Sequence, residues 1–226
     1  MRKSDQSLKE YVIQQTKGTG ILPCIKLHHK DDYIAYAQAM YDGGARVIEV
    51  TMTTPGVLEA IEAISDHFGD ELLVAAGTVL DPTSAREVIL HGGSIIVNPC
   101  VIDDVIDLAN RYNVPVFSGA FSATEVFNAM RMGAAMVKIF PGALGGPKYM
   151  TNLKMVFPEV NLIPSGGITP ANAAEFIRCG ACAVSGARTF MDFDKIEKEG
   201  LSSITRQVEK FINIIAEAKK DVPIIP

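Results

Sequence analysis

The sequence predicts an α/β fold, a closed (β/α)8 barrel of the TIM type with an extra N-terminal helix. Three observations lead to this prediction. Short apolar runs alternate with longer amphipathic stretches, the alternation gives eight such pairs, and most of the apolar runs are apolar on both faces, which is typical of parallel strands covered by helices. Strict alternation leaves a doubly wound sheet or a closed barrel, and eight units favour the barrel.

The predicted strands are short and dominated by aliphatic and β-branched side chains. In chain order they are Ile21–Leu27, Val47–Thr51, Leu72–Ala76, Ser94–Asn98, Val114–Ser118, Met136–Phe140, Asn161–Pro164 and Ala181–Ser185. Helical periodicity predicts a leading helix near Ser7–Thr16 and one helix after each strand. These helices lie near Asp31–Asp42, Pro55–Phe68, Thr83–Leu90, Ile102–Arg111, Ala123–Met132, Lys148–Phe157, Pro170–Arg178 and within Lys195–Lys219.

The ends of the predicted helices carry the expected signals. Thr169-Pro170 supplies an N-cap residue followed by proline at the first helical position. Glycines follow other helical patterns, as residues just past a helix C-terminus often do, at Gly43-Gly44, Gly92-Gly93, Gly133 and Gly180. The glycine-rich segment Pro141–Pro147 is expected to be a loop that closes over the site.

Composition bounds the class of protein. The chain has 226 residues, with 21 Lys+Arg against 26 Asp+Glu and a formal net charge of −5, so a nucleic-acid partner is not expected. Hydrophobic residues make up 48% and charged residues 21%, which excludes a disordered or collagenous chain. No linker or shift in composition interrupts the alternation, so we expect one domain over residues 1–226.

No signal-peptide pattern and no long apolar run occur, so we expect a cytoplasmic protein that does not interact with a membrane. The four cysteines are expected to be reduced thiols. Cys179 and Cys182 have the C-x-x-C spacing, but they lie between a helix C-terminus and a strand, which disfavours a redox or metal site. The histidines lack zinc-site spacings, so neither a metal nor a cofactor is expected.

Lys138 lies near the end of the sixth predicted strand, in a segment without another polar side chain. Because chemistry in such barrels lies at the C-terminal ends of the strands, polar residues there are the candidates for a site. A desolvated lysine with a lowered pKa is the nucleophile of imine-forming enzymes. The structural alternative is a lysine that extends from the strand end to water.

Glu49, on the second predicted strand, is a carboxylate among β-branched residues. Glutamate is disfavoured there unless it pairs with a buried cation or works as a general acid/base. A structural ion pair or a solvent-facing edge residue is the alternative. One amine and one carboxylate at the ends of separate barrel strands together indicate a covalent catalytic pair.

Glycine-rich turns follow the last two predicted strands. Ser165-Gly166-Gly167 precedes a predicted helix, and backbone N–H groups at such a turn bind anions, commonly a phosphate in this fold. Gly186 and Arg188 follow the eighth strand and are expected to complete that site, with Arg188 as a bidentate anion ligand. A tight turn that needs φ > 0 would carry the same glycines without binding anything.

Several segments together resemble the class I aldolases that cleave 2-keto-3-deoxy-6-phosphogluconate or 4-hydroxy-2-oxoglutarate, over nearly the whole chain. Gly43–Thr51 resembles the family segment that contains the general acid/base glutamate, and Ala76–Leu80 resembles its Gly-Thr-Val motif. Lys138–Pro141 is similar to its Schiff-base lysine motif, and Pro164–Ile168 resembles its phosphate-binding turn, with Ser165 where threonine is usual.

The resemblance implies roles for individual residues. Lys138 would form the imine, Glu49 would transfer protons, and Thr78, Pro99 and Phe140 would shape the pyruvate end of the pocket. Two positions depart from the family pattern. Thr53 and Lys26 stand where many members have arginines, one of which holds the substrate carboxylate, and lysine lacks the planar fork of arginine.

The function expected from the sequence is a Schiff-base aldolase that splits a 2-keto-4-hydroxy acid into pyruvate and an aldehyde. The substrate is expected to be 2-keto-3-deoxy-6-phosphogluconate, which yields glyceraldehyde 3-phosphate, with 4-hydroxy-2-oxoglutarate, which yields glyoxylate, also open. The resemblance further suggests a homotrimer. Two alternatives remain: a sugar-phosphate epimerase or isomerase without a covalent lysine, and a catalytically silent barrel that binds a keto acid.

Overall fold

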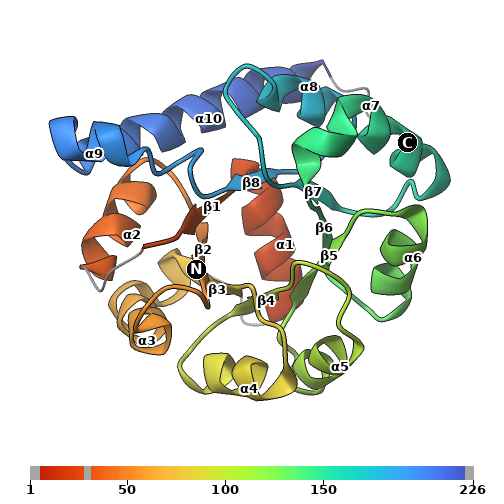
Figure 1. Cartoon of the computed structure of the whole chain (residues 1–226), viewed down its shortest axis with the longest axis horizontal. Coiled ribbons are helices and arrows are strands. Elements are labelled where there is room, and N and C mark those ends of the chain that lie inside the picture. Colours follow the sequence, from red (N-terminus) through yellow and green to blue (C-terminus); the bar gives the residue numbers. More distant parts are fainter. Residues whose placement is uncertain (1–5, 28–31, 222–226) are drawn as a thin grey trace.

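Eight short parallel strands are hydrogen-bonded into one sheet in the computed structural model, which describes residues 6–27 and 32–221. The strands are β1 (Ile21–Ile25), β2 (Val47–Thr51), β3 (Leu73–Gly77), β4 (Ile95–Val97), β5 (Val116–Ala120), β6 (Met136–Ile139), β7 (Leu162–Pro164) and β8 (Val184–Gly186). Their order is β7-β6-β5-β4-β3-β2-β1-β8. Two isolated parallel bridges, Leu162↔Ala181 and Ser165↔Ser185, join the β7 and β8 edges, so the sheet closes into the predicted barrel (Figure 1).

Helices surround this barrel on all sides, as Figure 1 shows. They are α2 (Tyr33–Asp42), α3 (Val57–Phe68), the short 3-10 helix η1 (Gly69–Glu71), α4 (Pro82–Leu90), α5 (Asp103–Arg111), α6 (Ala123–Arg131), α7 (Gly142–Val156), α8 (Ala173–Arg178), α9 (Phe193–Glu199) and α10 (Ser202–Lys220). The predicted strands and the alternation are confirmed, with strand ends shifted by at most three residues. The predicted start of the second helix at Asp31 lies outside the described residues.

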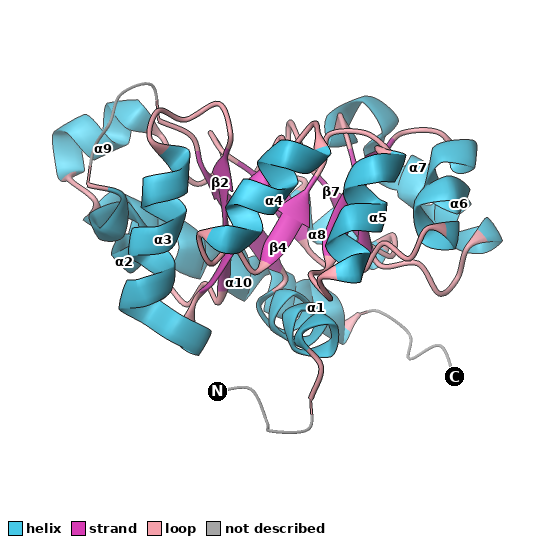
Figure 2. Cartoon of the chain, turned by 90° about the horizontal axis from the view of Figure 1, so that it is seen from below, coloured by secondary structure: helices cyan, strands magenta, loops and turns pink. Residues whose placement is uncertain are grey.

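The leading helix α1 (Leu8–Thr19) covers one end of the barrel, as the two views of Figures 1 and 2 show together. Tyr11 and Val12 on this helix are buried and pack against a cluster of apolar side chains inside the barrel. That cluster includes Val47 and Leu73, the first residues of their strands, so α1 closes the N-terminal end. The C-terminal end of the barrel lies opposite α1 and is not covered by this helix.

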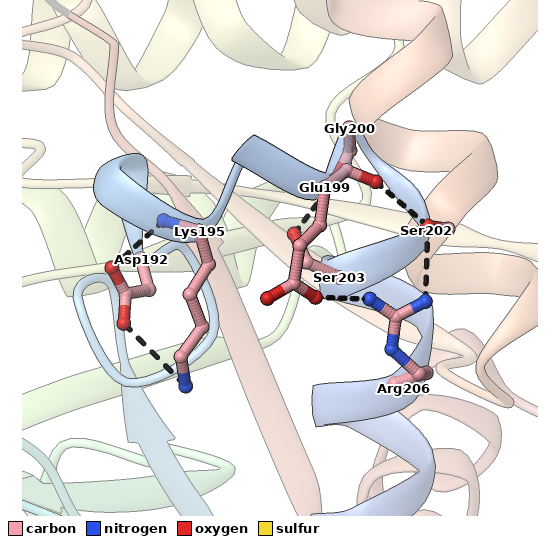
Figure 3. A network of polar contacts seen from close by, with 7 residues as sticks. All are labelled: Asp192, Lys195, Glu199, Gly200, Ser202, Ser203 and Arg206. Carbon is pink, nitrogen blue, oxygen red and sulfur yellow. Dashed lines mark hydrogen bonds and ion pairs between the residues drawn. The ribbon is translucent and has the colours of Figure 1, made fainter. Parts of the chain in front are cut away.

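The last predicted helix is in fact two. Gly200, with φ +71°, separates α9 from α10, and the predicted single helix within Lys195–Lys219 is wrong at this point. The break is stabilised by its own polar contacts (Figure 3): Arg206 donates to Glu199 and to Ser202 Oγ, and Ser203 Oγ donates to the Gly200 carbonyl. An amphipathic pattern continues across Gly200, so periodicity alone does not reveal the break.

The expected loop over Pro141–Pro147 is also wrong. Helix α7 begins at Gly142, and only Gly146, with φ +71°, interrupts it before it restarts at Pro147. The first turn is held by two backbone hydrogen bonds to the loop after β7, from Gly142 N–H to the Ser165 carbonyl (2.6 Å) and from Ala143 N–H to the Gly166 carbonyl (3.0 Å). These long-range bonds offset the low helix propensity of glycine, and local sequence cannot show them.

Within residues 6–27 and 32–221, no helix combines the length and apolar character that crossing a membrane requires.

The barrel interior gives the first testable prediction. Phe117 on β5 is fully buried in the interior cluster, so Phe117→Ala is expected to lower the free energy of unfolding by about 3–5 kcal/mol through lost burial and a cavity. Leu90→Ala on α4, where the side chain is 61% exposed, is the control and should change it by about 0.5 kcal/mol or less. Urea unfolding of both variants measures the difference, and equal losses would contradict this packing.

Candidate active site

Lys138 and Glu49 meet inside the C-terminal end of the barrel. The ammonium Nζ of Lys138, on β6, lies 3.1 Å from Oε2 and 3.3 Å from Oε1 of Glu49, on β2. Three strands separate β2 from β6 in either direction around the barrel, so the ion pair spans its interior. The side chain of Glu49 is 2% exposed and that of Lys138 is 12% exposed, so both side chains are largely removed from water.

Burial makes the two charges depend on each other. Taking an ammonium or a carboxylate out of water costs several kcal/mol, and the partner's charge offsets that cost only at close range. The lysine is the more exposed of the two side chains. A nucleophile and a proton acceptor within hydrogen-bond reach are the parts that covalent catalysis requires.

Strand β3 leaves space for the Glu49 side chain. Gly77, the last residue of β3, lies so close that a methyl group there would overlap the carboxylate of Glu49. The neighbouring strand residue Ala75, directly opposite Glu49 in the register, is also small. On the other side Cys24, opposite Glu49 on β1, brings its Sγ to 3.7 Å from Oε1.

The loops after β3 and β4 are tied to each other beside the ion pair. The buried amide of Asn98 donates to the Val79 carbonyl (2.7 Å), and Val79 N–H donates to the Val97 carbonyl (3.2 Å). Thr78, which directly precedes Val79 in the loop after β3, has φ +61°. This left-handed conformation is strained for a β-branched residue, and strained residues of this kind are concentrated at functional sites.

Pro99 packs against β5 next to Lys138. Gly119, opposite Lys138 in the β5–β6 register, has the Pro99 carbonyl where its side chain would be, so a larger residue at 119 is excluded. The structure thus places the predicted residues Thr78 and Pro99 on two linked loops at the end of the barrel that holds the ion pair.

The predicted anion turn follows β7. Ser165 is buried, and Gly166 and Gly167 have φ +84° and +75°, so both need the freedom of glycine. Phe140 is 44% exposed, and its ring lies over Gly166. A side chain at position 166 would have its Cβ 3.1 Å from the edge of that ring.

The helix expected to begin at Pro170 begins instead at Ala173. Asn172 Oδ1 accepts from Thr169 N–H (2.8 Å) and its amide donates to the Gly167 carbonyl (3.1 Å), so a side-chain turn replaces the first helical turn. The sequence-based prediction of a Thr169 N-cap is therefore wrong, and the turn is held by asparagine.

Gly186 is the last residue of β8, and Arg188 lies two residues further on, in a loop joined to the glycine turn. Thr189 Oγ1 donates to the Ile168 carbonyl (2.7 Å), a contact that the sequence did not suggest. Arg188 is exposed and lines a pocket of about 430 Å³ together with Asp192 and Asp194. Those two carboxylates oppose the binding of an anion by Arg188 within that pocket.

Thr53 and Lys26 lie on the loops after β2 and β1, and both are exposed. The hydroxyl of Thr51, two residues beyond Glu49 on the same strand, is 3.0 Å from that of Thr53 and 3.1 Å from that of Thr54. A cluster of neutral hydroxyls thus lies at the end of β2. Thr53 stands in the sequence where many members of the similar aldolase family have an arginine.

The class of protein is a (β/α)8-barrel enzyme, because a lysine and a glutamate are paired inside the C-terminal end of the barrel, where active sites of this fold lie. The family model "KDPG and KHG aldolase" matches residues 12–207, and the chain belongs to this family. The 2-dehydro-3-deoxy-6-phosphogalactonate aldolase of Escherichia coli is 38% identical over 69% of this chain and 76% of its own length. The 2-dehydro-3-deoxy-phosphogluconate aldolase of Treponema pallidum is 31% identical over 86% of this chain and 93% of its own.

Solved structures agree with the sequence relatives. The 2-keto-3-deoxy-6-phosphogluconate aldolase of Legionella pneumophila, with pyruvate captured as a covalent carbinolamine, superposes with a TM-score of 0.81 at 27% identity and covers 90% of this chain and 97% of that chain. A designed cube-shaped cage made by fusing symmetric oligomeric domains gives a TM-score of 0.82 at 30% identity over 89% of this chain and 73% of that chain.

The contact between β3 and Glu49 is testable. Gly77→Ala is expected to lower the free energy of unfolding by about 1–3 kcal/mol, because the methyl group displaces the buried carboxylate. In a Glu49→Ala background the same change should cost at least about 1 kcal/mol less. Urea unfolding of the four proteins of this cycle measures the coupling.

Gly18→Ala is the matched control, since open space surrounds Gly18 within α1, and it should be neutral or stabilising. If Gly77→Ala costs the same with and without the Glu49 side chain, the proposed overlap does not exist.

Proposed function

We propose that this protein is a Schiff-base aldolase that cleaves a 2-keto-4-hydroxy acid to pyruvate and an aldehyde, with Lys138 as the nucleophile and Glu49 as the general acid/base. The observation that carries the proposal is the contact of 3.1 Å between the two side chains inside the barrel. Membership of the KDPG and KHG aldolase family supports it, as does the covalent carbinolamine that names the Legionella structure.

The reaction begins with transfer of a proton from the Lys138 ammonium to Glu49, which the contact permits. The neutral amine attacks C2 of the keto acid and forms a carbinolamine. Glu49 then returns its proton to the carbinolamine hydroxyl, which leaves as water and gives a protonated imine beside an ionised Glu49. The imine accepts the electron pair of the C3–C4 bond, while Glu49 accepts the proton of the C4 hydroxyl. The aldehyde leaves, and protonation of the enamine at C3 followed by hydrolysis releases pyruvate and the free lysine.

The remaining residues bind the substrate. Thr78, Pro99 and Phe140 surround the pyruvate portion, and Thr53 and Lys26 contact its carboxylate from the loops after β2 and β1. At the distal end, Ser165, Gly166, Gly167 and Gly186 bind a phosphate group. Arg188 contributes positive charge to that end. The support is their position on loops at one end of the barrel and the direct hydrogen bond between the loops after β7 and β8.

We further propose that the chain works in the cytoplasm as a homotrimer. The symmetric oligomeric domains of the designed cage support assembly, and so do exposed apolar side chains on neighbouring helices. Phe127 is 52% exposed and stacks on Phe157 with ring centroids 6.5 Å apart, and Met155 is 77% exposed. Apolar surface of this kind is typical of contacts between subunits.

The assignment of the catalytic pair predicts the effect of two substitutions. Lys138→Arg keeps a positive charge beside Glu49 but cannot form an imine, so pyruvate release should be abolished. Glu49→Gln should lower kcat by about 10²- to 10⁴-fold, because the amide cannot accept the C4 hydroxyl proton. A coupled lactate dehydrogenase assay measures pyruvate release by both variants. Lys210→Arg, at an exposed position of α10, is the control.

Full activity of Lys138→Arg would contradict the Schiff-base assignment and favour an epimerase or isomerase that needs no covalent lysine. Wild-type protein that binds pyruvate but releases none from any 2-keto-4-hydroxy acid would identify a silent keto-acid-binding barrel.

For the substrate, we propose 2-keto-3-deoxy-6-phosphogluconate. Charge-assisted hydrogen bonds from the glycine turn should raise kcat/KM for a phosphorylated substrate about 10- to 100-fold above that for 4-hydroxy-2-oxoglutarate. The 38% identity to the phosphogalactonate aldolase makes the C4 epimer, 2-keto-3-deoxy-6-phosphogalactonate, the second candidate. Comparison of kcat/KM for the three acids tests this, and equal values with and without phosphate would contradict a phosphate site.

A further inference from the structure

The carboxylate of Glu49 has a second hydrogen-bonding neighbour besides Lys138. Cys24 lies directly opposite Glu49 in the β1–β2 register, with Sγ 3.7 Å from Oε1. The side chain of Cys24 is 4% exposed, so water does not compete for the thiol. The other acceptor in reach is the Ile25 carbonyl, 3.8 Å from Sγ.

The thiol is a donor in this contact. Burial, followed by the negative charge of Glu49, raises the pKa of Cys24 well above its usual value, and the nearby charges of Lys138 and Lys26 only partly oppose this. The thiol therefore keeps its proton at neutral pH. Its S–H group then points to an acceptor, and the ionised carboxylate of Glu49 is a stronger acceptor than the Ile25 carbonyl.

Within the described residues, two side chains donate hydrogen bonds to Glu49, those of Cys24 and Lys138. Lys138 faces it from β6, and β3 presents Ala75 and Gly77, which carry no titratable group. The ammonium of Lys138 has three N–H donors, but a protonated imine retains one. The thiol contacts Oε1, whereas Oε2 is the oxygen nearer to the Lys138 nitrogen, so the contact with Cys24 leaves the second carboxylate oxygen for proton transfer.

We propose that Cys24 is a positioning residue, whose thiol orients the Glu49 carboxylate while Lys138 is bound to the substrate. The proposal rests on the proposed aldolase function.

Two substitutions distinguish a hydrogen-bonding role of the Cys24 thiol from a packing role. Cys24→Val keeps a side chain of similar volume without a donor, and Cys24→Ser keeps a donor. A donor to the ionised carboxylate favours that form, so Cys24→Val should move the acid limb of the pH profile of kcat/KM to higher pH by about half a pH unit. Cys24→Ser should restore the wild-type position of the limb.

Cys182→Val is the matched control. Cys182 is also a protonated thiol, with burial raising its pKa to about 11, but it donates to the Leu162 carbonyl (3.3 Å) instead of Glu49. This variant should leave the acid limb unchanged. If Cys24→Val has the same limb as wild type and Cys182→Val, Cys24 only fills space and the proposal is wrong.

Infrared spectroscopy tests the contact without turnover. The S–H stretching band of Cys24 is the band that disappears in Cys24→Val, and Glu49→Gln should shift it towards the frequency of a free thiol because the amide is a weaker acceptor. An unchanged band would overturn the role of Cys24. Absence of pyruvate release by wild-type protein would instead overturn the proposed function, so the two failures are distinguishable.

Discussion

The packing of the barrel interior depends on the buried ion pair between Lys138 and Glu49. Neither charge is stable inside the barrel without the other, and they reach each other only because β2 and β6 face each other across it. The Glu49 carboxylate also needs space next to β3, and Gly77, which has no side chain, leaves that space. Apolar side chains fill the layer below, where Phe117 and the residues of α1 close the barrel.

The site divides into a fixed half and a variable half. The ion pair lies on strands whose backbone is held by neighbours on both sides, so the geometry of bond making is rigid. The groups expected to recognise the rest of the substrate lie on loops, where Asn98 and Thr189 tie neighbouring loops together. The sequence of the loops can therefore vary without moving the ion pair.

Much of the fold was predictable because most of the buried strands are mainly apolar, and Lys138 and Glu49 stood out as the charged exceptions in two of them. The pairing of the two was predicted from closure of the barrel, whereas the geometry of their contact is given by the structure alone. The contacts of Gly77 and Cys24 with Glu49 were not predicted, because they depend on side-chain positions that neither the Gly-Thr-Val motif nor a cysteine in an apolar run reveals. The errors in α7 and at Gly200 arose where long-range hydrogen bonds or a single glycine override local propensity.

The central claim is that Lys138 forms an imine with the keto acid. Incubation with pyruvate, reduction with cyanoborohydride and peptide mass spectrometry test it directly, since reduction converts the imine into a stable secondary amine. The account predicts one pyruvate-derived adduct per chain, on the peptide containing Lys138, and none in Lys138→Arg. An adduct on another lysine, or no adduct under conditions that label a known Schiff-base aldolase, would contradict it.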